Sequence, residues 1–125
     1  MREDQFVEKV AGRAAVGFEA AESLTAAVLR VLSQRISGGE AADLASQLPA
    51  GLKPHLLGAG EPAQAFDADD FVRRVADRTG TDPDRARAAV RAVFTTLRET
   101  ATLGELDEVT SQLPKDFRDL VGAPH

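Results

Sequence analysis

The sequence repeats itself at an interval of 65 residues, and this repetition limits the folds that the chain can adopt. When residues 1–60 are compared without gaps with residues 66–125, 16 of the 60 pairs are identical. Ordinary amino-acid usage would give roughly 4 identities. The run Ser-Gln-Leu-Pro at 46–49, for example, recurs at 111–114. We interpret the chain as a tandem duplication.

The repeat predicts the domain boundaries. Residues 1–57 form the first helical repeat and residues 67–125 the second, joined by a linker over residues 58–66 that is rich in Gly and Pro. A unit of about 57 residues is marginal alone, because it buries only about 60% of its surface. We therefore expect the two repeats to pack as one globular domain. Phe66 in the linker favours this packing over a solvated tether.

Apolar residues in each repeat recur at spacings of three and four, which is typical of one face of a helix. The pattern predicts four helices per repeat, and Pro49 is expected to begin the fourth helix because it cannot continue the third. No segment alternates with a period of two. The predicted fold is therefore all-α: a tandem duplication of a four-helix unit, with about eight helices packed with pseudo-twofold symmetry.

The ends of two helices in the second repeat are clearly marked. Gly80 suits the left-handed residue that ends a helix, Asp82 suits the N-cap of the next helix, and Pro83 suits its first turn. The first repeat has Val-Gly-Phe at 16–18 where the second has Thr-Asp-Pro. The sequence leaves open whether the two turns share one geometry.

The run over residues 35–49, Arg-Ile-Ser-Gly-Gly-Glu-Ala-Ala-Asp-Leu-Ala-Ser-Gln-Leu-Pro, with Phe-Val-Arg-Arg-Val-Ala at 71–76, resembles the bacterial proteins grouped as domain of unknown function 2267. These proteins are small, helical and often duplicated. The resemblance covers nearly the whole chain, although the second copy departs from the run at residues 106–110. It implies the fold, and it gives no catalytic residues.

Composition excludes several classes of function. The chain has no cysteine, so a disulfide, a thiol nucleophile, an iron–sulfur cluster and a thiolate zinc site are excluded. The net charge of -5 disfavours binding to nucleic acid. Uncharged stretches reach about nine residues, well short of the roughly 20 needed to cross a bilayer. We expect a cytoplasmic protein without a cofactor, a nucleic-acid partner or a membrane anchor.

Two polar positions are repeated and are therefore candidate binding residues. Glu40 and Glu105 each follow a hydroxyl residue by three positions, as in a capping box, and Gln47 and Gln112 precede Leu-Pro in both copies. A carboxylate pair or a repeated amide could bind a ligand. We favour structural roles for all four, with the acids capping helices and the amides bonding the carbonyls at a helix end.

The acidic cluster of Asp67, Asp69 and Asp70 lacks the spacing of a calcium loop, so we assign it to capping a helix N-terminus. His55 is expected to be half-buried, and His125 is the last residue. Neither histidine has a Ser/His/Asp arrangement around it. No metal site or catalytic residue is predicted.

Arginine is concentrated between residues 70 and 99, a segment with seven positively charged and five negatively charged residues. Asp70 with Arg73, and Asp84 with Arg87, have the spacing of ion pairs on a solvated helix. Arg87, Arg91 and Arg98 share one side of the helix at spacings of four and seven. These three are the candidate face for an acidic partner.

The sequence therefore favours a non-enzymatic module that binds a protein partner or a second copy of itself. The alternative is a small-molecule-binding protein or an enzyme, with a pocket between the two repeats that uses Glu40, Gln47, Glu105 and Gln112. The choice between these two functions depends on where the fold places the polar residues.

Overall fold

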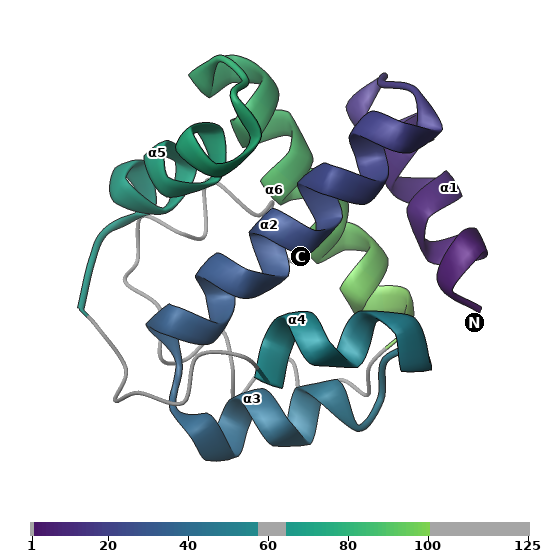
Figure 1. Cartoon of the computed structure of the whole chain (residues 1–125), viewed down its shortest axis with the longest axis vertical. Coiled ribbons are helices and arrows are strands. Elements are labelled where there is room, and N and C mark those ends of the chain that lie inside the picture. Colours follow the sequence, from purple (N-terminus) through teal and green to yellow (C-terminus); the bar gives the residue numbers. More distant parts are fainter. Residues whose placement is uncertain (1, 58–64, 101–125) are drawn as a thin grey trace.

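The computed structural model describes residues 2–57 and 65–100, and all regular structure in these ranges is helical (Figure 1). The predicted all-α class is confirmed. The prediction of eight helices is not supported, because the described residues form six α-helices and the last two predicted helices lie outside them, after residue 100. The elements are α1 (Glu3–Ala14), α2 (Phe18–Arg35), α3 (Gly38–Ala45), the 3-10 helix η1 (Ala50–Leu52), α4 (Lys53–Leu57), α5 (Ala68–Thr79) and α6 (Pro83–Thr100).

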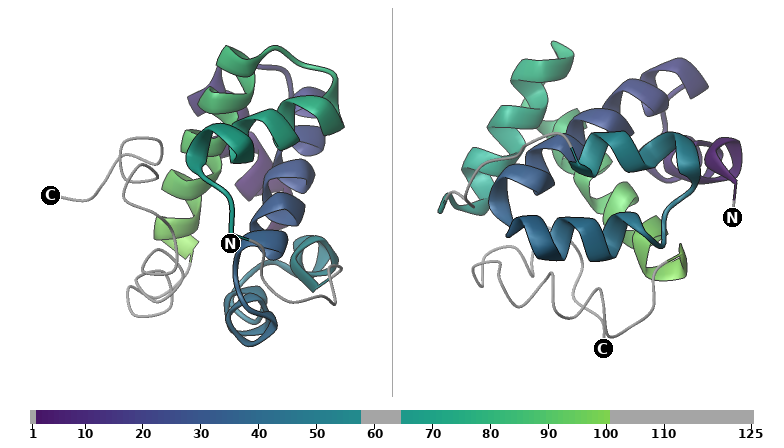
Figure 2. Two further views of the ribbon diagram at one scale, coloured as in Figure 1. Left: turned by 90° about the vertical axis from the view of Figure 1, so that its left-hand side faces the viewer. Right: turned by 60° about the horizontal axis from the view of Figure 1, so that its bottom comes forward.

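The two long helices, α2 and α6, contact each other at the centre of the molecule (Figure 1). The most extensive contact joins α1 to α6, and α5 packs against α2 in the same manner, so that each short helix contacts the long helix that lies further away in the sequence. A layer of α3 and α4 lies at one end of this assembly, with α4 packed against α2 (Figure 2). None of the helices within the described ranges is both long and apolar enough to span a membrane.

Helices α1 and α2 have the same lengths and spacing as α5 and α6. Helices α1 and α5 have 12 residues each, α2 and α6 have 18 each, and every bound of α5 and α6 lies 65 positions after its counterpart. Similar hydrophobic spacing produces this agreement, because the apolar stripe determines which residues each helix can bury.

The core is one apolar cluster to which all six helices contribute. Phe6 of α1 and Phe71 of α5 are both fully buried, and the ring of Phe71 lies 6.4 Å from that of Phe94. Leu44 in α3 and Leu48 just after it are also buried. Leu57, the last residue of α4, is 55% exposed.

Phe66 closes the edge of this core, as the sequence predicted, and is 7% exposed. The Nε of Arg35 donates to the Phe66 carbonyl at 3.0 Å, and the guanidinium of Arg74 lies 3.9 Å from the centre of the Phe66 ring. A guanidinium over an aromatic face contributes about 0.5–1 kcal/mol at an exposed site. Two arginines from different helices thus hold the segment before α5 against the core.

Helices α1 and α5 end in the same way despite different residues. Ala15 has φ 57° and Gly80 has φ 66°, so both lie in the left-handed region. The amide of Val16 bonds the Ala11 carbonyl, and the amide of Thr81 bonds the Ala76 carbonyl. The predicted role of Gly80 is confirmed, and the first repeat uses a strained alanine in the equivalent turn.

We expect replacement of Ala15 by Gly to raise the free energy of unfolding by about 0.5–1 kcal/mol, because glycine avoids the cost of a left-handed L-residue. Gly80→Ala should lower it by about 1 kcal/mol. A Cβ at Gly80 would touch no neighbouring atom, so backbone strain is the only cost. Urea denaturation of both variants measures the two changes, and equal changes of one sign would contradict this account.

Two threonines buried in the long helices differ in their hydrogen bonding. The Thr96 hydroxyl donates to the Ala92 carbonyl at 2.8 Å and accepts from Arg13 at 2.8 Å. The Thr25 hydroxyl is fully buried and has no hydrogen-bond partner among the described residues. Its counterpart in the second repeat is Val90, which has the same shape without the hydroxyl. A buried unsatisfied hydroxyl costs about 1–3 kcal/mol.

Thr25→Val should therefore stabilise the protein by about 1 kcal/mol. Thr96→Val is the matched control and should destabilise it by a similar amount, because Arg13 then loses one of its two acceptors. The free energy of unfolding in urea measures both. The account of Thr25 is wrong if its valine variant is less stable than the original protein.

Candidate functional site

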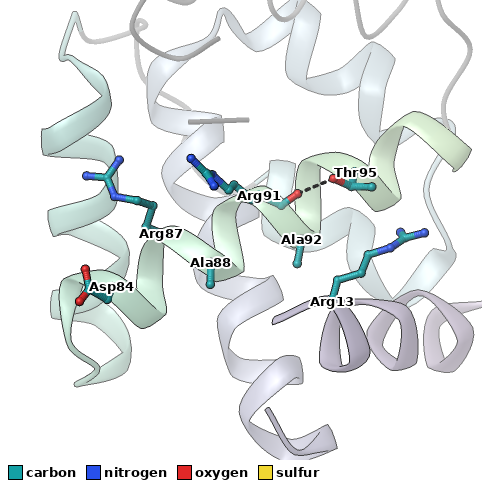
Figure 3. A pocket seen from close by; sticks show the side chains of 7 residues that line it. All are labelled: Arg13, Asp84, Arg87, Ala88, Arg91, Ala92 and Thr95. Atoms are coloured by element: carbon teal, nitrogen blue, oxygen red, sulfur yellow. Dashed lines mark hydrogen bonds between the residues drawn. The ribbon is translucent and has the colours of Figure 1, made fainter. Parts of the chain in front are cut away.

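A groove of about 430 Å³ lies on the surface where the C-terminal end of α1 meets α6 (Figure 3). We call it the α6 groove, and it is open to solvent. One wall residue comes from α1 and the other six come from α6. The lining residues are Arg13, Asp84, Arg87, Ala88, Arg91, Ala92 and Thr95.

Helical spacing explains the shape of the groove. Ala88 and Ala92 are four residues apart and project from the same side of α6 (Figure 3). Their methyl groups are short, so the surface is hollow between them and the longer side chains around it. Arg87 directly precedes Ala88 in the helix, and Arg91 directly precedes Ala92 (Figure 3). The hydroxyl of Thr95 donates to the Arg91 carbonyl at 2.8 Å, so it serves the backbone of its own helix.

Positive charge dominates the lining. Arg13, Arg87 and Arg91 are opposed by one carboxylate of the lining, Asp84. Arg87 also lies 3.4 Å from a carboxylate oxygen of Asp69 on α5. Both members of this pair are exposed to solvent, and exposed ion pairs contribute about 0–1 kcal/mol. The groove thus combines an apolar floor with guanidinium groups, a chemistry that binds carboxylates.

Arg13 is held in place by partners on α6. Its Nη2 donates to Glu99 at 2.8 Å, and Lys9 lies 3.4 Å from the other carboxylate oxygen of Glu99. The hydrogen bond from Arg13 lowers the pKa of the Glu99 carboxyl, and Lys9 lowers it further. With its bond to Thr96, Arg13 joins α1 to α6 at the end of the groove.

The two repeated polar positions of the first repeat lie away from this groove. The Ser37 hydroxyl accepts from the Glu40 amide at 3.2 Å, so the N-cap of α3 has formed where the capping box predicted it. Gln47 lies just after α3. Neither Glu40 nor Gln47 lines the α6 groove. Glu105 and Gln112 lie outside the described residues.

The acidic cluster before α5 caps that helix. Asp67 accepts from the amide of Asp70 at 2.9 Å, and Asp70 pairs with Arg73 at 2.7 Å, both as the sequence predicted. The Asp82 carboxylate caps α6 by accepting a hydrogen bond from the backbone amide of Arg85 at 2.8 Å. In the part of the chain that the structure describes, no three His, Asp or Glu side chains gather as a metal site.

His55 is half-buried, as predicted, and its Nδ1 is enclosed without a hydrogen-bond partner among residues 2–57 and 65–100. It lies in the short helix α4, which packs against α2 and α3. It is not part of the α6 groove.

The sequence identified part of the groove and missed the rest. Arg87 and Arg91 line it, whereas Arg98, the third member of the predicted face, does not. Arg13 could not be found from sequence because it is 78 positions from Arg91 and meets α6 only through packing. The available signal was the pair of small residues, Ala88 and Ala92, between charged positions on one helix face.

We expect the bond between Arg13 and Glu99 to make stability depend on pH. Because the pKa of Glu99 is lowered from its ordinary value of 4.5, its contribution is present above about pH 4.5 and is lost as the pH falls through the lowered pKa. Glu99→Gln should lower the melting temperature near neutral pH, and the difference from the original protein should disappear in acid. Glu8→Gln, an exposed change elsewhere on α1, is the control and should show no such convergence.

Comparisons with known proteins identify the family of the chain. A search of curated proteins found no match. One family model matches residues 3–120, nearly the whole chain, in agreement with the resemblance carried by the run over residues 35–49. The chain therefore belongs to the family described as uncharacterized conserved protein (DUF2267).

Proposed function

We propose that this protein is a non-enzymatic interaction module that binds an acidic segment of a protein in the α6 groove. The observation that carries the proposal is the lining itself, in which three arginines, Arg13, Arg87 and Arg91, occur together with the small side chains of Ala88 and Ala92. The whole chain has a net charge of -5. The groove is thus a local basic site on an acidic molecule, and it selects partners that concentrate carboxylates.

The chemistry of the lining favours a protein partner. A guanidinium binds a carboxylate through two parallel hydrogen bonds, which gives direction as well as strength. The alanine floor allows the backbone of a partner helix to come close, as small residues do at helix contacts generally. An amphipathic helix with Glu at spacings of three or four would meet both features, since its acids and its apolar residues fall on one face.

The alternative function, a small-molecule pocket or an enzyme site at Glu40, Gln47, Glu105 and Gln112, stays a prediction. The Ser37 hydroxyl caps α3 through the backbone amide of Glu40, so this bond does not by itself assign a role to the Glu40 carboxylate. Cytoplasmic location likewise stays a prediction.

We also infer that the chain arose by tandem duplication, with repeats over residues 1–57 and 67–125 that pack with pseudo-twofold symmetry. The matching helix bounds support this inference, and so does a pair of equivalent polar contacts. Lys9 of α1 meets Glu99 of α6, and the residues 65 positions away in each case, Arg74 and Gln34, also meet, at 3.1 Å.

The proposal predicts that an acidic helical peptide, with Glu residues at spacings of three and four, binds the protein in a manner that weakens with salt. Arg87→Glu/Arg91→Glu should reduce the affinity at least tenfold, because hydrogen bonds between charged groups contribute about 1.5–3 kcal/mol each. Fluorescence anisotropy of the labelled peptide measures the affinity.

The matched control is Arg73→Glu/Arg85→Glu, which changes the net charge equally at exposed positions outside the groove. An equal loss of affinity in both double variants would show that net charge, not the groove, attracts the peptide. Glu40→Ala and Gln47→Ala should lower the melting temperature and leave the affinity unchanged. A loss of peptide binding in these two variants would contradict the assignment of the groove.

A further inference from the structure

The first two turns of α2 carry an exposed surface that is both acidic and aromatic. Phe18 is 43% exposed, which is unusual for a large apolar side chain in this molecule. Glu19 and Glu22 follow it and are also exposed. Residues 17–29 include no Lys or Arg. We call Phe18, Glu19 and Glu22 the α2 acidic face.

Two residues of the α2 acidic face, Glu19 and Glu22, lie 65 positions before two residues that line the α6 groove, Asp84 and Arg87. A shift of 65 residues places Glu22 on Arg87 and Ala26 on Arg91. Helices α2 and α6 have the same length and bury residues at similar positions. Residues 65 positions apart therefore lie on the same side of their helices relative to the core. The charge changes sign at one of these positions, from Glu22 on α2 to Arg87 on α6, and α6 adds Arg91 where α2 has Ala26.

The two surfaces are also complementary in spacing. Glu19 and Glu22 are three residues apart, or about 4.5 Å along the helix axis, and Arg87 and Arg91 are four apart, or about 6 Å. The long arginine side chains can span this difference. Phe18 is next to the two acids, and the short side chains of the groove floor leave room for a ring. A large aromatic side chain in a pocket, with charges around it, is the usual anchor of a protein interface.

We propose that the α6 groove of one molecule binds the α2 acidic face of a second copy of this chain. This inference rests on the proposed function of the groove and names its partner. The two surfaces on each molecule are different, so the contact is head-to-tail. Such a contact leaves one free groove and one free acidic face in every dimer, and it builds longer assemblies or a closed ring as concentration rises.

The test is sedimentation velocity of the full chain over a range of protein and salt concentrations. The original protein should sediment faster as its concentration rises, and high salt should suppress this change because it screens exposed charges. Glu19→Arg/Glu22→Arg and Arg87→Glu/Arg91→Glu should each weaken self-association at least tenfold. Arg73→Glu/Arg85→Glu is the control for a change of charge outside both surfaces, and it should weaken self-association much less.

Mixing the two weakened variants gives the sharpest result. The first variant keeps an intact groove and the second keeps an intact acidic face, and their two reversed surfaces also carry opposite charges. An equal mixture should therefore recover the self-association that each variant loses alone. Phe18→Ser should weaken self-association of the original protein without changing its charge. Circular dichroism checks that each variant is folded. If Glu19→Arg/Glu22→Arg does not fold, the milder variant Glu19→Gln/Glu22→Gln takes its place.

Three results would overturn the inference: an original protein that stays monomeric at every concentration, self-association that both double variants retain, or no dimer in the mixture. Each is distinguishable from failure of the proposed function. A monomeric protein that still binds the acidic peptide through Arg87 and Arg91 keeps its groove function with a different partner. A protein that neither binds the peptide nor self-associates loses both.

Discussion

The fold depends on the packing of α1 against α6 and of α5 against α2. Phe6 on α1 and Phe71 on α5 are completely buried, and both pairs of helices are in contact although their members lie far apart in the sequence. A segment of about 57 residues is marginal alone, because it buries only about 60% of its surface. The same packing brings Arg13 to α6, so the groove depends on a contact between the two halves of the chain.

Features set by neighbouring residues could be predicted from sequence. The cap at Asp82, the left-handed Gly80 and the burial of Phe66 all follow from local chemistry or from side-chain size, and the structure contains each. Ala15 could not be predicted in the left-handed region, because alanine has no local preference for it. Arg13 could not be assigned to the groove, since its position there depends on contacts between helices far apart in sequence.

The two long helices show how one backbone pattern can serve two purposes. Their buried positions are nearly equivalent, with Ala21, Val28 and Leu32 matched by Ala86, Val93 and Leu97. Their exposed positions differ in charge, because solvent places few limits on residues that the core does not contact. Buried residues thus preserve the helix and its neighbours, and the surface of each helix is left to acquire its own binding chemistry.

The position of Arg13 links the groove to the attachment of α1. Its guanidinium donates to Thr96 and Glu99 and also lines the groove. A carboxylate bound in the groove would compete with Glu99 for the same donors, and its binding would then be thermodynamically coupled to the attachment of α1. Since such coupling is reciprocal, a change that weakens the attachment of α1 would also change the affinity of the groove.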